Sequence, residues 1–91
     1  MDTKIYRASG SIENASPKDG QQFSLEELQK IVDGYIELVR LSDGRVMVCN
    51  EDGKSRNLPM NQNATTVMRS DRPTTDYLVG DVLVCPSDMV A

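Results

Sequence analysis

The stretch FSLEELQKIVDGYIELVRLSDGRVMVCN, residues 23–50, changes from a helical to a strand-like pattern of apolar residues. In its first half, Leu25, Leu28, Ile31 and Val32 recur at the spacing of one helical face. In its second half, apolar and polar residues follow one another in short β-like runs on both sides of a turn signal. The stretch therefore predicts a helix followed by a β-hairpin.

The limits of the predicted helix are marked by capping residues. Ser24 is a favourable N-cap, and Glu27 three residues later completes a capping box. Phe23, just before the cap, can pack against Leu28. Gly34 is expected to supply the left-handed residue that ends the helix. These signals predict a helix of about nine residues.

The hairpin is predicted from Asp43-Gly44, because a type I′ turn needs positive φ at both central residues. With a two-residue loop, Leu41 faces Val46, Val39 faces Val48 and Glu37 faces Asn50. In this register Glu37 and Asn50 share one surface of the hairpin with Tyr35.

Asp52-Gly53 is a second turn signal of the same kind. With a two-residue loop here as well, Asn50 would lie opposite Ser55 and Val48 opposite Asn57. Glu37, Asn50 and Ser55 would then form a polar row across three strands.

The segments around this stretch are less regular. TKIYRAS at residues 3–9 predicts a strand anchored by Ile5, and GSIENASPKDGQQ at residues 10–22 predicts a loop that is mobile or functional. DYLVGDVLVCPS predicts a final strand at residues 82–85, with a bend or bulge at Gly80.

After Pro59, the segment MNQNATTVMRS can open a second short helix of about seven residues. Asn61 or Asn63 would be its cap. Its inward residues would be Ala64, Val67 and Met68.

The chain has 91 residues, which predicts one domain. The expected fold class is α+β: an antiparallel sheet of three to five short strands with one capped helix and the second short helix. Residues 1–22 would be a strand plus a mobile loop, and residues 23–85 the core. So small a core gains stability when a face is shared between subunits, so we expect a homo-oligomer.

The formal net charge of −4 opposes nonspecific nucleic-acid binding, which needs a basic surface. Residues 40–72 nevertheless hold six basic and four acidic residues. Two interpretations stay open: chance scatter over solvated faces, or a locally positive pocket for an anion.

Cys49 and Cys85 both lie in aliphatic runs. We expect two buried thiols in a reducing cytoplasm; a disulfide is the alternative if their strands lie side by side. No apolar run approaches the roughly 20 residues that span a bilayer, so we expect no membrane association.

The composition argues against catalysis and metal binding. Histidine is absent, and the two cysteines are isolated. We therefore predict no enzyme, no metal and no cofactor. Glu37 is the one carboxylate that could support acid–base chemistry; the simpler interpretation pairs it with a neighbouring arginine or with Asn50.

The remaining polar residues suit binding. Amide and hydroxyl groups can hold a ligand by hydrogen bonds, and arginine can hold a carboxylate or phosphate in a fork. The predicted ligand-binding residues are Tyr35, Glu37, Asn50, Ser55, Arg56, Asn57, Asn61, Asn63, Thr65 and Arg69. The alternative for the asparagines is a structural one, in which they cap helices and turns.

Four motifs occur in a characteristic order: LEELQKIVDGYIELV, DGRVMVCNEDGK, LPMNQNAT and VGDVLVC. Together they resemble a small family catalogued as a domain of unknown function, which occurs in bacteria, plasmids and phages. The resemblance covers residues 24–85, and MRSDRPTTD lies outside its pattern. It implies a compact cytoplasmic α+β domain of phage or mobile-element origin, with no activity assigned.

These observations lead to two functional hypotheses. The first is a non-catalytic protein that sequesters a small anionic, nucleotide-like ligand, such as a signalling nucleotide, in the host cytoplasm. The alternative is a protein-interaction module that inhibits or recruits a host protein.

Overall fold

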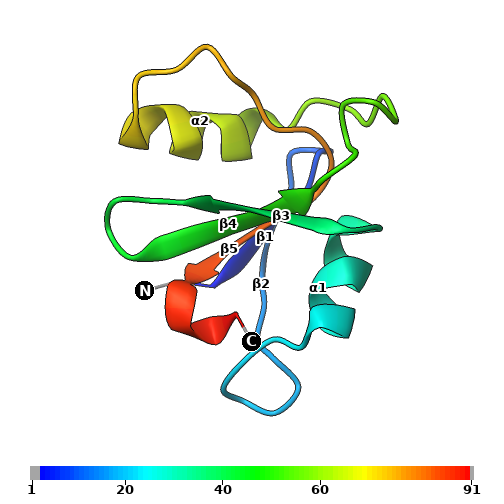
Figure 1. The fold of residues 1–91 in the computed structure, drawn as a ribbon, viewed down its shortest axis with the longest axis vertical. Helices are drawn as coiled ribbons and strands as arrows, with labels where there is room; N and C mark the ends of the chain where they lie inside the picture. The colour runs from blue at the N-terminus through cyan, green and yellow to red at the C-terminus, as the bar shows by residue number, and fades with distance from the viewer. Residues whose placement is uncertain (1–2, 91) are drawn as a thin grey trace.

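A computed structural model describes residues 3–90 as a five-stranded sheet with two helices (Figure 1). The strands are β1 (Lys4–Tyr6), β2 (Ile12–Asn14), β3 (Ile36–Arg40), β4 (Arg45–Asn50) and β5 (Val82–Pro86). The helices are α1 (Leu25–Val32), α2 (Gln62–Asp71) and the 3-10 turn η1 (Ser87–Met89). Every strand pair is antiparallel, in the order β2-β1-β5-β4-β3. The predicted α+β class is confirmed.

The sheet separates two apolar layers. Figure 1 shows α2 on one face of the sheet and α1 with η1 on the other, here called the α2 face and the α1 face. The α1 face is packed with Ile5, Phe23, Leu28, Val32, Val46, Val48, Leu83 and Cys85. The α2 face is packed with Leu41, Met47, Cys49, Ala64, Met68, Leu78, Val82 and Val84. Residues of β4 and β5 alternate between the two layers, as the pleat of a strand requires.

The predicted capping box of α1 is confirmed. The backbone N–H of Glu27 donates to Ser24 Oγ at 3.1 Å, and the N–H of Ser24 donates to Glu27 Oε1 at 3.0 Å. The predicted end is wrong by one residue, because the left-handed residue is Asp33, with φ of 60°, and not Gly34. Asn50 holds this end, since its Nδ2 donates to the carbonyls of Val32 and Asp33 at 3.0 and 3.1 Å.

The β3–β4 hairpin forms, but its predicted register is wrong. Leu38 lies opposite Val48 and Glu37 lies opposite Cys49, because the loop has three residues, 42–44. Gly44 adopts a φ of 90°, whereas Asp43 is not among the residues of positive φ, so the turn is not of type I′. A shift of one residue moves side chains to the other face, so Glu37 and Asn50 are on opposite faces of the sheet.

The second predicted hairpin is also wrong. Residues 51–57 form consecutive turns, in which the N–H of Arg56 donates to the Asp52 carbonyl at 2.9 Å. The free edge of β4 pairs instead with β5, where Val46 lies opposite Cys85. No strand can add there, and the polar row of Glu37, Asn50 and Ser55 does not form.

The outer segments largely agree with expectation. β1 forms with Ile5 buried, but the predicted loop at residues 10–22 contains β2, which pairs with β1. Asn61 is the N-cap of α2, which at 10 residues is longer than predicted. Gly80 has a φ of 73°, which gives the predicted bend before β5.

The two cysteines lie on different sides of the sheet. Cys49 belongs to the α2 face and Cys85 to the α1 face, and both thiols are free. The alternative of a disulfide is therefore wrong. Among residues 3–90, no helix has both the length and the apolar composition needed to cross a membrane.

Candidate functional site

Asn61 is a structural residue. Its side chain is fully buried, and its Oδ1 accepts the N–H of Ala64 at 2.9 Å as the cap of α2. Its Nδ2 donates to the carbonyls of Tyr6 at 2.7 Å and Gly80 at 2.8 Å. One amide thus joins α2 to β1 and to the segment before β5. All three of these hydrogen bonds are made with backbone groups.

Thr65 and Asn63 connect α2 to other segments in the same way. Thr65 is buried, and its Oγ1 accepts the N–H of Leu78 at 3.0 Å. Asn63 Nδ2 donates to the carbonyl of Gly10 at 3.1 Å. The polar stretch 61–65 therefore serves as a structural junction in this fold.

Arg69 and the residues of the 51–57 turns also contact backbone. Arg69 donates to the carbonyls of Asp76 and Thr75 at 3.0 and 3.1 Å, which fixes the loop after α2. Ser55 Oγ donates to the Asp52 carbonyl at 3.0 Å, and Asn57 adopts a left-handed φ of 55°. Asparagine tolerates that conformation better than most residues.

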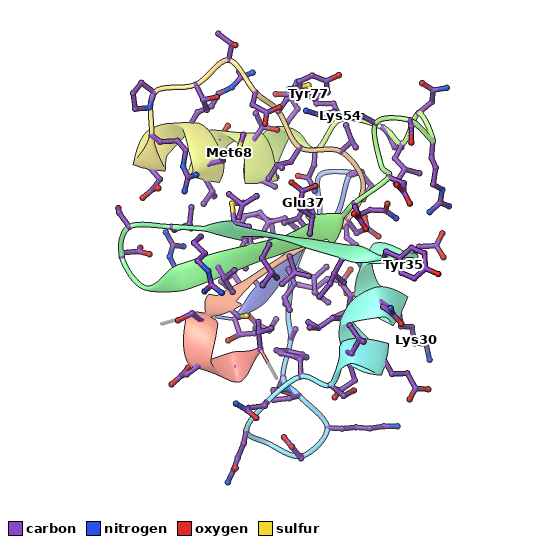
Figure 2. The ribbon with its side chains drawn as sticks, in the orientation of Figure 1. Lys30, Tyr35, Glu37, Lys54, Met68 and Tyr77 are labelled. Carbon is purple, nitrogen blue, oxygen red and sulfur yellow. The ribbon has the colours of Figure 1, made fainter. Side chains whose placement is uncertain are left out.

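Two of the predicted residues, Tyr35 and Arg56, do converge. They line a groove of about 300 Å³ together with Gln29, Gly34 and Asp52; we call it the Tyr35 groove. The Tyr35 side chain is 67% exposed, and Figure 2 shows it projecting outward beside the start of β3. The groove lies where the end of α1, the start of β3 and the 51–57 turns meet.

The Arg56 guanidinium is held in a defined position. Its Nη1 donates to the Asp33 carbonyl at 2.7 Å, and its Nη2 lies 3.4 Å from Asp33 Oδ2. A guanidinium has five N–H donors, so several remain for a ligand. Asp52 adds a carboxylate to the groove, which can accept hydrogen bonds from hydroxyl or amino groups.

Glu37 lies apart from this groove. It lines a smaller cavity of about 110 Å³ on the α2 side with Lys54, Asp76 and Tyr77 among others. Lys54 Nζ lies 4.3 Å from the centre of the Tyr77 ring and is ion-paired with Asp76. Figure 2 shows Lys54 and Tyr77 together above the sheet, with Glu37 below them. The Asn50 amide bonds the end of α1 instead, so the expected Glu37–Asn50 pair is wrong.

Another cavity holds none of the predicted residues. It measures about 550 Å³, between α1 and the β1–β2 hairpin, with Ile5, Phe23 and Ile31 among its apolar lining. Of its charged residues, Arg7 is ion-paired with Glu13 at 2.7 Å and Asp81 at 3.0 Å. The hydrogen bond from Arg7 also holds the pKa of Glu13 below its usual value. The charge of Arg7 is thus already matched by two carboxylates.

The surplus of basic residues at 40–72 is dispersed. Arg45 pairs with Asp43, Lys54 with Asp76, Arg56 with Asp33 and Arg72 with Asp71. Each pair combines opposite charges, which limits any local positive potential. The finding agrees with the interpretation of scattered charge.

The described residues include no cluster that would bind a metal. Within residues 3–90, no group of three or more His, Cys, Asp or Glu side chains is placed to hold an ion.

Sequence reasoning missed Gln29, Gly34 and Asp52 as groove residues. Each has an ordinary local role: Gln29 is a helix residue, Gly34 follows the helix, and Asp52 lies within the 51–57 turns. Their convergence depends on Asn50, which draws the end of α1 toward the 51–57 turns. That relation is invisible in a local pattern.

The fold and the groove define a small α+β domain whose five-stranded sheet carries one helix on each face. The chain belongs to the family described as Domain of unknown function (DUF3846), whose model matches residues 9–89. The match confirms the resemblance and extends beyond residues 24–85 in both directions. Comparison with curated proteins and with solved structures gave no match.

Proposed function

We propose that this chain is a non-catalytic binding protein that holds a small, nucleotide-like ligand in the Tyr35 groove. The observation that carries the proposal is the convergence of Tyr35 and Arg56 on one groove of about 300 Å³. An aromatic ring and a guanidinium fork are the two groups best suited to a planar base and a phosphate. The volume lies at the small end of the range for ligand sites.

The exposed ring of Tyr35 supports recognition of a planar group. At 67% exposure it has much of its surface to bury when a base stacks on it. Stacking of a base on an aromatic side chain contributes about 1–3 kcal/mol.

The position of Arg56 supports recognition of one phosphate. Its bond to the Asp33 carbonyl at 2.7 Å fixes the guanidinium before any ligand arrives, which lowers the entropy cost of binding. Asp52 disfavours a ligand of high negative charge but can accept the hydroxyls of a ribose. The groove therefore suits a nucleoside monophosphate unit better than a triphosphate.

The biological setting we propose is sequestration. A protein of a phage or mobile element that retains a signalling nucleotide in the host cytoplasm would lower the free concentration of that signal without altering it. Tight retention needs slow release, which a site closed by a second subunit would favour.

The proposal is tested by calorimetric titration with AMP, GMP and inorganic phosphate. We expect heat with a nucleoside monophosphate and little with phosphate alone. Tyr35→Ala and Arg56→Gln should each weaken binding about 10- to 100-fold. Tyr77→Ala and Arg45→Gln are the matched controls, since they remove the same groups outside the groove. Silent titrations, or full affinity in Tyr35→Ala, would reject the groove as a nucleotide site.

A protein-interaction module is the second candidate function. Several apolar side chains are exposed, among them Ile12 at 49% and Leu25 at 55%. Recovery of one host protein at fixed stoichiometry, together with silent nucleotide titrations, would favour this candidate. Leu25→Ser should then abolish the recovery.

A further inference from the structure

We propose that two copies of this chain pair antiparallel through β3, with Leu38 of each copy at the two-fold axis. β3 is the end strand of the sheet, and its Leu38 side chain is 37% exposed. The pairing would join the two sheets into one continuous sheet. Its basis lies in the backbone of β3, in the register that symmetry permits, and in the charges at the two ends of the strand.

The outward backbone groups of β3 follow from its hydrogen bonds to β4. The carbonyl of Tyr35 accepts the N–H of Glu51 at 2.9 Å, and the N–H of Leu41 donates to the Arg45 carbonyl at 2.9 Å. In an antiparallel ladder such residues alternate with residues that point away. The backbone groups of Tyr35, Glu37, Val39 and Leu41 therefore face β4, and those of Ile36, Leu38 and Arg40 face outward.

Two-fold symmetry limits the register. With a two-fold axis perpendicular to the sheet, odd-numbered residues of one copy lie opposite odd-numbered residues of the other, and even-numbered residues lie opposite even-numbered ones. Leu38 opposite its own copy places Ile36 opposite the partner's Arg40, so all the outward residues take part. The register that sets Glu37 opposite the partner's Glu37 brings like charges together, which is destabilising.

The other neighbouring register, with Val39 at the axis, leaves the outward groups of Ile36 unpaired. Arg72 Nη2 already donates to the carbonyl of Arg40. A carbonyl has two lone pairs, so this oxygen can accept a strand amide as well. The register with Leu38 at the axis is therefore the one expected.

The charges along β3 favour a second copy as the partner. Glu37 lies near the start of the strand, and Arg40 and Arg72 lie at its end. Glu37 and Arg72 belong to the α2 side of the sheet, whereas the Arg40 side chain is on the α1 side. Antiparallel pairing with an identical strand therefore sets Glu37 toward Arg72 of the partner subunit, twice by symmetry. The opposite edge of the sheet, β2, has only 3 residues and offers a shorter ladder.

The pairing also affects the Tyr35 groove, a consequence that rests on the proposed function. Arg40 lies opposite Val46 in β4, a residue of the α1 face, so its side chain is on the side of the sheet where the groove lies. In the dimer the partner's Arg40 lies opposite Ile36, the residue after Tyr35. The positive charge of the partner's Arg40 would offset the negative charges of Asp33 and Asp52 and complete an anion site between the subunits.

The pairing is tested by sedimentation equilibrium of the full chain without ligand, over a range of concentrations. We expect a dimer for the wild type. Leu38→Lys places two like charges at the axis and should weaken the dimer about 100-fold or more. Ile12→Lys is the matched control on the β2 edge and should leave the mass unchanged. A monomeric wild type, an unaffected Leu38→Lys or a dissociated Ile12→Lys would each overturn the proposal.

A cross-link gives a second readout if Leu38→Lys fails to fold. Directly opposed residues of a hydrogen-bonded pair have Cα atoms about 5.5 Å apart, within reach of a disulfide. On oxidation by oxygen, Leu38→Cys should form a covalent dimer as two thiols lose two electrons and two protons to the oxidant. Ile12→Cys should not. Equal cross-linking of the two variants would overturn the pairing, whereas a dimer with silent titrations would overturn only the proposed function.

Discussion

The side-chain amide of Asn61 donates to the carbonyl of Gly80 at 2.8 Å and so fastens the start of α2 to the entry of β5. Asn61→Ala removes this bond together with the helix cap and leaves the buried carbonyl of Gly80 without this donor. We expect a loss of about 2–4 kcal/mol in the free energy of unfolding, measured by urea titration. Asn63→Ala is the control: its bond to Gly10 is exposed, and a change within about 0.5 kcal/mol is expected. Equal losses in both variants would contradict a special role for Asn61.

Gly34 is needed because the end of α1 is crowded. A Cβ at this position would lie 2.7 Å from Asn50 Nδ2 and 3.2 Å from Arg56 Nη1. Gly34→Ala should therefore displace both side chains and lower the free energy of unfolding by about 1–3 kcal/mol. If the groove binds ligand, affinity should fall as well. Gly20→Ala is the comparison, since φ is positive there as well, at 80°, but a Cβ meets nothing within 4 Å. An unfolding curve of Gly34→Ala equal to wild type would show that this crowding has no cost.

Glu27 should make stability depend on pH in the acid range. Hydrogen bonds from the backbone N–H groups of Ser24 and Lys18 lower the pKa of its carboxyl below the ordinary 4.5. The stabilisation is therefore fully present above about pH 4.5 and is lost as pH falls through the lower pKa of the folded state. Melting temperatures measured from pH 7 downward should fall less steeply in Glu27→Gln. Glu26→Gln removes the same charge from the first turn without touching the capping box, and the same flattening there would refute the assignment.

The two native thiols should be unreactive while the protein is folded. Burial raises the pKa of Cys49 to about 12 and that of Cys85 to about 11, and the thiolate is the reactive form. Labelling by Ellman's reagent at pH 8 should be slow in buffer and should follow the urea unfolding transition. Ile12→Cys gives the contrast, because that position is 49% exposed and its thiol should label at once. Fast labelling of the wild type in buffer would mean that the sheet opens readily.

The sequence predicts most reliably those elements whose determinants are local. The capping box of α1 joins Ser24 to a residue three positions away, and Asn61 caps α2 through Ala64 at the same spacing. Such contacts lie within a few residues of one another, and the fold cannot rearrange them without breaking the helix. Both helices were predictable for this reason, although the length of α2 was underestimated.

The hairpin register depends on a distant residue. Ser42 is held by Asp71, which accepts its backbone N–H at 3.0 Å from 29 positions further along the chain. This bond makes Ser42 part of a three-residue loop that Asp43-Gly44 alone does not reveal. The second hairpin failed for a related reason, because β5 occupies the edge of β4 that the 51–57 segment would have needed.

The candidate site was predictable only in part. Residue type identified Tyr35 and Arg56 as groups able to bind, and these two do meet. For the asparagines, residue type does not reveal whether the side chain contacts a ligand or the backbone. Only the positions of Tyr6 and Gly80, far from Asn61 in the sequence, show which of these applies to it.

The central position of β5 determines when the sheet can be completed. The β1–β2 and β3–β4 hairpins each join neighbouring segments, but the two meet only through residues 82–86. During synthesis both hairpins would leave the ribosome with an unpaired strand edge, of 3 residues in β1 and 6 in β4, until β5 is made. The sheet is thus completed late and in a single step. A nascent chain that stalls before Val82 would expose two hairpins with unpaired strand edges, which could bind to other proteins.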